Sequence, residues 1–250
     1  MLIFARVLPL IRARVDANLR RHSLPREQVL AAVVRLLELT LLRVGNDGYA
    51  KANKSFGLTT LRDRHAEITG SHIHLRFRGK GGARYETDIN DPRVRASSNL
   101  ADLPGYELFQ YLDDAGERHT VSSTEVNAYL REITGEDTTA KDFRTWPRPI
   151  WPRSRCENFA RVDSEAKRKR AVVRTVERVA KHLGNAPAVC RRCYIHPAIF
   201  EGFLDGTLLA TLAAKTRVYV AQKIEGMSAE ETAVVAFLRF RPGELAEEAA

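Results

Sequence analysis

The chain is short of cysteine and contains no long run of apolar residues. Its three cysteines, Cys156, Cys190 and Cys193, are an odd number in a sequence with no export signal, so we expect no structural disulfides. No apolar run approaches the length of a membrane span, and the apolar part of the N-terminus is too short for a secretory signal. These absences predict a cytoplasmic protein that does not enter a membrane.

The spacing of cysteine and histidine gives a weak signal for a metal. Cys190 and Cys193 could bind zinc together with His196 and Cys156, but a single pair of cysteines without a second pair is weak evidence. We therefore expect no metal site. The sequence also contains no internal repeat and no long flexible linker.

Positive charge is concentrated in one part of the chain. The net charge is +9, and the segment from Lys141 to Tyr194 alone holds 15 Lys or Arg against 5 Asp or Glu. A concentrated basic face favours a polyanion, with nucleic acid as the first candidate. The alternative is an ordinary solvated basic surface.

Apolar spacing predicts helices over residues 5–65 and 98–240. The second helix is expected to begin after Pro25 and to end at Arg43, and capping patterns predict helix starts at Ser122, Thr139 and Ser228. Gly184 is expected to end another helix. A further helix is expected at 204–214.

Residues 71–89 alternate between apolar and polar side chains, which predicts a β-hairpin with Lys80 near its tip. The expected fold is therefore α+β, mainly α with a small β-hairpin or sheet, in a single domain over residues 1–250.

Tyr194 lies among the cations Arg191, Arg192 and His196. Such a tyrosine is either a nucleophile or a phosphate ligand, although a half-buried packing residue would look the same. Three other stretches favour the chemical interpretation. They are Arg43-Val-Gly-Asn-Asp-Gly-Tyr49 followed by Phe56-Gly-Leu-Thr-Thr-Leu61, then Phe77-Arg-Gly-Lys80-Gly-Gly, and then Thr139-Ala-Lys-Asp-Phe-Arg144-Thr-Trp146.

Together with Asn185 and Tyr194, these stretches resemble the catalytic domain of the type IB DNA topoisomerases, in the compact bacterial and poxvirus-like branch. The resemblance covers about residues 4–206. It implies a topoisomerase IB or tyrosine recombinase-like catalytic core. The implied activity is isomerase activity, the relaxation of supercoiled duplex DNA.

The resemblance also implies a role for each matching residue. Tyr194 would attack the scissile phosphorus and form a 3′-phosphotyrosine, while Lys80 would protonate the leaving 5′ oxygen with help from Arg43. Arg43 and Arg144 would hold the non-bridging oxygens, and Asn185 would add a neutral donor. The implied contacts to the DNA backbone are Tyr49 and Lys141.

These cations would replace a metal, so the resemblance implies neither a metal nor a nucleotide cofactor. The expected partner is duplex DNA, bound by a monomer associated with the nucleoid. We interpret Trp146, His65 and His182 as packing or solvated residues.

Two features depart from the family pattern. Residues 147–163 carry Pro149 and Pro152 where the family has an apolar helix, and proline cannot lie inside a helix without removing hydrogen bonds. Compensating frameshifts around Pro147 to Arg161 would explain this segment. The family's β-rich N-terminal domain has no counterpart, so we expect the catalytic domain alone.

Two rival functions remain open at this stage. A tyrosine recombinase-like strand exchange uses the same nucleophile and similar cations. An inactive, basic DNA-binding remnant would retain the charge without the chemistry.

Overall fold

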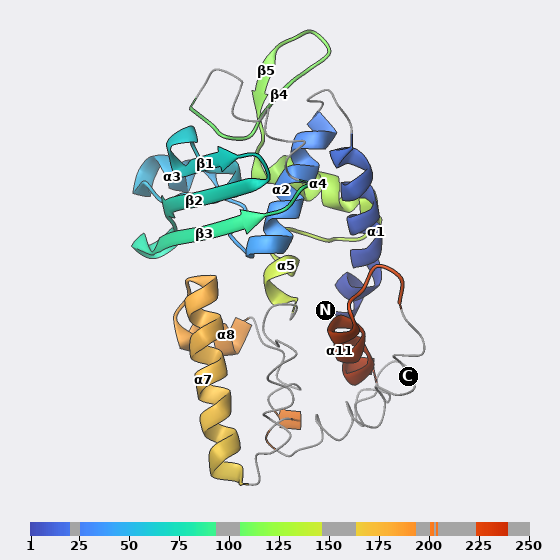
Figure 1. Ribbon diagram of the computed structural model, residues 1–250, viewed down its shortest axis with the longest axis vertical. Coiled ribbons are helices and arrows are strands. Elements are labelled where there is room, and N and C mark those ends of the chain that lie inside the picture. The colour runs from blue at the N-terminus through green and yellow to red at the C-terminus, as the bar shows by residue number, and fades with distance from the viewer. Residues whose placement is uncertain are drawn as a thin grey trace. The chain divides into compact units, whose positions relative to one another are not determined.

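The computed structural model describes residues 1–20, 26–93, 106–146, 164–193, 201–202, 204 and 224–239. The chain divides into two compact units. The sheet unit is Leu10–Arg144, and the terminal unit is Met1–Pro9 with Thr145–Ala250. Helix α1 (Leu2–Leu19) contributes to both units. The fold is α+β, with helices and small antiparallel sheets, as the sequence predicted (Figure 1).

Helix α2 (Arg26–Thr40) forms the core of the sheet unit. Its residues are buried on nearly every side, including Leu30 and Val33 at 0% exposure. A helix that is apolar around its whole circumference is stable only when other elements surround it. Four elements pack against α2: strand β3 (Arg84–Asn90), strand β4 (Gln110–Leu112), helix α4 (Ser123–Thr134) and the 3-10 turn Leu58–Thr60. Helix α4 begins with the predicted capping box, in which Ser122 Oγ accepts from Glu125 N.

Three antiparallel strands form the larger sheet in the order β1-β2-β3. They are β1 (Ala66–Thr69), β2 (His72–Arg78) and β3 (Arg84–Asn90). Phe77 pairs with Tyr85 at the far end of β2, and the apolar residues of β2 are buried. Strands β2 and β3 confirm the predicted hairpin, and the turn between them carries Lys80.

A second hairpin joins β4 (Gln110–Leu112) to β5 (Arg118–Thr120). The sequence had placed residues 98–240 in a helical region, so this hairpin is a correction. Its strands have three residues each, which is too few for alternation to reveal.

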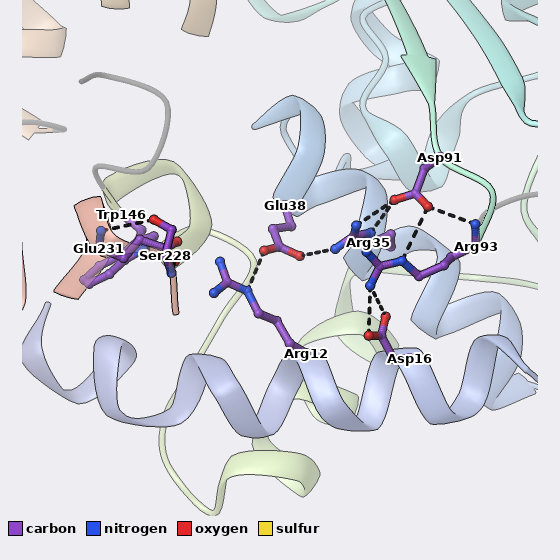
Figure 2. Close-up of polar contacts among 9 residues, drawn as sticks. All are labelled: Arg12, Asp16, Arg35, Glu38, Asp91, Arg93, Trp146, Ser228 and Glu231. Atoms are coloured by element: carbon purple, nitrogen blue, oxygen red, sulfur yellow. Dashed lines mark hydrogen bonds and ion pairs between the residues drawn. The ribbon is translucent and has the colours of Figure 1, made fainter. Parts of the chain in front are cut away.

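A chain of ion pairs joins α1, α2 and the end of β3 (Figure 2). Arg35 Nη2 lies 2.7 Å from Asp91 Oδ2, and Arg35 Nη1 lies 2.9 Å from Glu38 Oε2. Because Asp91 directly follows β3, its pairing with Arg35 ties the hairpin to the core helix. The six members of this network are Arg12, Asp16, Arg35, Glu38, Asp91 and Arg93.

The terminal unit contains α7 (Glu165–Leu183), α8 (Pro187–Cys193) and α11 (Ala229–Arg239). Helix α7 ends at Gly184, whose φ of 59° is left-handed, as the sequence predicted. Helix α8 packs against α7 (Figure 1). The helix expected at 204–214 lies outside the described residues, apart from Leu204.

Helix α11 holds the indole of Trp146 (Figure 2). Trp146 is 3% exposed and its Nε1 donates to Glu231 Oε1 at 3.1 Å. The other Glu231 oxygen accepts from Ser228 N at 2.9 Å, which forms the predicted capping pattern. Phe4 meets the Trp146 ring edge to face, with centroids 5.9 Å apart. Trp146 is thus a packing residue with a satisfied polar group.

Within the described residues, no helix combines the length and the apolarity that crossing a bilayer requires.

Candidate active site

Arg43 lies in a stretch without regular secondary structure and not at the end of a helix, which corrects the sequence expectation. Helix α2 stops at Thr40, and Leu41 takes a left-handed φ of 55°. Leu42 N then donates to Thr40 Oγ1 at 3.2 Å. The main chain therefore turns sharply before Arg43, which is half-buried.

The backbone of Arg43 is fixed by residues 56–60. Arg43 O accepts from Leu58 N at 2.9 Å, and Val44 O accepts from Thr59 N at 2.7 Å. The Thr59 hydroxyl also donates to Val44 O at 2.9 Å. Three hydrogen bonds over two residues leave the Arg43 main chain little freedom.

Two glycines allow these stretches to approach. A Cβ built at Gly57 would lie 2.5 Å from Gly45 Cα and 2.7 Å from Arg43 O. Gly45 itself has a φ of +110°, which side chains rarely adopt. Any larger residue at position 57 would push Arg43 away from its anchor.

Arg144 is attached to the same turn. It lies on the short helix α5 (Asp142–Thr145), is 4% exposed, and donates through Nη1 to Leu41 O. The predicted Thr139 cap is present, because Thr139 N donates to Asp142 Oδ2 at 2.8 Å. The left-handed Leu41 thus accepts a hydrogen bond from Arg144 and lies two residues before Arg43.

Lys80 lies at the glycine-rich tip of the β2–β3 hairpin. Gly79 N donates to Ala83 O at 2.8 Å, and Gly81 and Gly82 take left-handed φ values of 74° and 78°. The base of this tip is fixed by Phe56 N, which donates to Arg78 O at 2.8 Å. The Lys80 side chain is exposed, and its Nζ lies 5.3 Å from the centroid of the Tyr49 ring.

Tyr49 lies on α3 (Asp47–Asn53) and is 49% exposed. Asn46 caps this helix by accepting from Tyr49 N at 3.0 Å. Lys141, the other predicted DNA contact, is exposed just before α5. Exposed cations gather on and after α3 and around the hairpin tip, namely Lys51, Lys54, Arg76, Arg78, Lys80 and Arg84.

His65 supports the middle of this arrangement as a packing residue. Its ring centroid lies 4.5 Å from that of Phe56, and Nδ1 accepts from Arg62 N at 3.1 Å. Burial lowers the pKa of His65, and the nearby Arg64 and Arg62 lower it further. A neutral imidazole fits this role, since Nδ1 must accept a hydrogen bond.

Hydrogen bonds of residues 41–46 and 56–60 link the parts of the sheet unit that carry Arg43, Arg144, Lys80 and Tyr49. Asn185 belongs to the terminal unit, where it follows Gly184 and its N donates to Ala180 O at 2.9 Å. Tyr194 and the segment 147–163 lie outside the described residues, as does the side chain of His182.

The sequence places residues 56–61 in a motif that resembles the family, but it does not predict that they hold other parts of the site. Gly57, Leu58 and Thr59 hold Arg43, and Phe56 holds the Lys80 turn. No local pattern could reveal this, because each bond joins residues far apart in sequence.

One group of possible metal ligands is found among the described residues. Ligand atoms of Asp113, Glu117 and His119 lie within 4.8 Å of one another at the β4–β5 hairpin. Asp113 is already engaged, because its Oδ1 accepts from Glu117 N and its Oδ2 lies 2.8 Å from His119 Nε2. The hydrogen bond from His119 holds the pKa of Asp113 below its usual value. The three residues therefore lie close together because their hydrogen bonds close the β4–β5 turn. Of the predicted zinc ligands, Cys190 is buried, and Cys156, His196 and the side chain of Cys193 are not described.

Comparison with known proteins matches most of the chain. The family model described as eukaryotic DNA topoisomerase I, catalytic core, covers residues 1–206. DNA topoisomerase 1B of Acanthamoeba polyphaga mimivirus is 29% identical over 190 residues, which make up 72% of this chain and 56% of the viral protein. DNA topoisomerase 1B of Vaccinia virus (strain Copenhagen) is 23% identical over 227 residues, 86% of this chain and 67% of that protein. The chain therefore spans between about half and two thirds of these two relatives.

Proposed function

Because the chain belongs to the type IB DNA topoisomerase family, matching its catalytic core over residues 1–206, we propose that it relaxes supercoiled duplex DNA. Tyr194 attacks a backbone phosphorus, the bond to the 5′ oxygen breaks, and a 3′-phosphotyrosine forms. The 5′ hydroxyl later attacks this phosphotyrosine and restores the strand. Between the two steps, torsion rotates the free end.

The observation that carries this proposal is the attachment of both predicted arginines to one turn. Arg144 donates to Leu41 O, and Arg43 follows Leu41 in a stretch fixed by Leu58 and Thr59. One arginine that follows this turn and a second that is hydrogen-bonded to it suit a phosphate, because each guanidinium group can donate to two oxygens. In the proposed reaction they stabilise the charge that develops on the non-bridging oxygens.

Lys80 and Asn185 complete the proposed set of donors. Lys80 gives its proton to the leaving 5′ oxygen, and the phenol proton of Tyr194 passes to solvent. Asn185 donates to a non-bridging oxygen. Because arginine and lysine supply the positive charge and the covalent bond conserves the energy of the cut, we propose that neither a metal nor ATP takes part. Tyr49 and Lys141 contact the backbone of the duplex. The chain binds the duplex as a monomer.

The test is relaxation of a supercoiled plasmid without ATP and with a chelator of divalent metals. Wild-type protein should relax the plasmid and, when denatured during the reaction, remain covalently attached to DNA. Tyr194→Phe should form no adduct, while it binds DNA with unchanged affinity.

Other outcomes contradict the proposal in recognisable ways. A product that depends on one defined DNA site would favour strand exchange of the recombinase kind. Salt-sensitive binding of duplex DNA without any adduct would favour a DNA-binding remnant.

A further inference from the structure

The ammonium group of Lys80 lies over the face of the Tyr49 ring, 5.3 Å from the ring centroid. The face of an aromatic ring carries partial negative charge and attracts a cation at such distances. The contact uses the ring of Tyr49 and leaves its hydroxyl available for a phosphate. It therefore adds a second role to a residue that sequence reasoning assigned only to the DNA backbone.

The backbones that carry the two side chains are tied together. Tyr49 is placed by the Asn46 cap, and α3 ends at Lys54 with a left-handed φ of 49°. Two residues later, Phe56 N donates to Arg78 O at the base of the Lys80 turn. The ring is thus delivered to the hairpin tip by a short, hydrogen-bonded path.

Lys80 needs such a restraint more than the arginines do. Arg144 is 4% exposed and bonded to a carbonyl, whereas Lys80 is exposed on a tip between glycines. A lysine side chain has four rotatable carbons and loses much entropy when it is held in one position. An aromatic ring restrains the ammonium group without removing its protons.

We propose that Tyr49 is a positioning residue for Lys80, whose ring holds the ammonium group ready to protonate the leaving 5′ oxygen. This inference deepens the proposed function and rests on it for its catalytic consequence. The restraint itself exists in the free protein and can be measured there.

The first experiment is nuclear magnetic resonance of the free protein labelled with isotopic lysine. The Lys80 side-chain signal, assigned by its loss in Lys80→Arg, should show the upfield displacement that an aromatic face causes. The displacement should persist in Tyr49→Phe, which keeps the ring, and vanish in Tyr49→Leu. Tyr106→Leu is the matched control, because Tyr106 is 78% exposed outside the site. A Lys80 signal that Tyr49→Leu leaves unchanged would overturn the proposal.

The second experiment is single-turnover cleavage of two DNA substrates. One has the natural 5′ oxygen at the cleavage site, and the other has a 5′ sulfur, which leaves without protonation. Tyr49→Leu should slow cleavage of the oxygen substrate by about two- to fivefold more than that of the sulfur substrate, the size expected of an exposed cation–π contact. Tyr49→Phe should change both rates by one common factor, since it loses only the hydroxyl. Equal oxygen-to-sulfur ratios in Tyr49→Leu and Tyr49→Phe would contradict the proposal.

The two experiments separate the inference from the proposed function. If wild-type protein cleaves neither substrate, the proposed function fails, while the lysine signal still decides whether the ring holds Lys80. If wild-type protein cleaves both and the ratio does not respond to loss of the ring, only the inference fails.

Discussion

At the scale of single residues, the site depends on two glycines, because the absence of their side chains allows two main-chain stretches to approach. Gly45 and Gly57 approach so closely that a Cβ at position 57 would lie 2.5 Å from Gly45 Cα, and a Cβ at position 45 would lie 2.9 Å from Thr59 Oγ1. This approach allows Leu58 N to reach Arg43 O at 2.9 Å. A predicted phosphate ligand is thus positioned by a contact between two residues that have no side chain.

Gly57→Ala should therefore damage both stability and cleavage. The added Cβ would lie 2.5 Å from Gly45 Cα, so the backbone must move. We expect the free energy of unfolding to fall by at least the roughly 1–3 kcal/mol typical of overpacking. Urea denaturation measures this change, and single-turnover cleavage measures the displacement of Arg43.

The matched control is Gly48→Ala on α3. Its Cβ would meet only Asn46 Oδ1, at 3.3 Å, and alanine favours a helix by about 0.5–1 kcal/mol over glycine. Equal losses in the two variants would show that the Gly45–Gly57 contact is not what matters.

At the scale of elements, buried charge fixes the hairpin to the core. Asp91 is 6% exposed and Arg35 is 8% exposed, and they join the end of β3 to α2. Removing Asp91 would leave the buried Arg35 guanidinium with Glu38 but without its second carboxylate, so its charge would be only partly compensated.

Asp91→Asn should lower the free energy of unfolding, by up to the roughly 3–5 kcal/mol typical of a broken buried pair, because Glu38 still compensates part of the charge of Arg35. Asp137→Asn is the control, because Asp137 is exposed and pairs with Arg131 at 3.0 Å, where such pairs contribute less than about 1 kcal/mol. Thermal or urea denaturation of both variants makes the comparison. Similar stability in the two would refute a structural role for the network.

The pKa of His74, on strand β2 of the three-stranded sheet, should respond to its carboxylate neighbours. A hydrogen bond to Asp88, 2.8 Å away, raises the pKa of His74 above its ordinary value of about 6.5, and Glu86 and Glu67 raise it further. Because the folded pKa is raised, the stabilisation is complete below the unfolded pKa and is lost as the pH rises through the folded pKa. In Asp88→Asn the midpoint of the His74 titration, followed by nuclear magnetic resonance, should fall. An unchanged midpoint would contradict the assignment.

Local signals allowed much of this fold to be predicted, and non-local contacts account for the rest. The cap at Ser122, the stop at Gly184 and the Lys80 hairpin are each set by neighbouring residues. The predicted end of α2 was wrong, because Leu41 and Leu42 continue the apolar spacing beyond Thr40. In the structure the carbonyl of Leu41 instead accepts a hydrogen bond from Arg144, 103 residues away. The anchoring of Arg43 by Leu58 escaped notice for the same reason.

At the scale of the whole molecule, the predicted site residues are divided between the two units. Arg43, Lys80 and Arg144 belong to the sheet unit, and Asn185 to the terminal unit. The boundary follows Arg144 directly. Two residues later Trp146 is held by Glu231, which lies beyond the 1–206 range of the family match.

A double-mutant cycle tests this attachment of α11. Trp146→Phe and Glu231→Gln should each lower the free energy of unfolding, by about 1.5–3 kcal/mol for a hydrogen bond to a charged group. The double variant should lose less than the sum, because Trp146→Phe removes the same hydrogen bond that Glu231→Gln weakens. Glu177→Gln on the exposed face of α7 is the control and should stay within about 0.5 kcal/mol of wild type. Strict additivity in the cycle would refute the coupling.

Residues 56–60 fix two parts of the site, since their main-chain amides donate both to the Arg43 stretch and to the base of the Lys80 turn. A change in residues 56–60 would therefore weaken two proposed steps together, the stabilisation of charge on the phosphate oxygens and the protonation of the leaving 5′ oxygen. The two losses of rate would then multiply in the rate of cleavage. Natural variation here should be confined to changes that preserve the main-chain path, while the surrounding loops are free to diverge.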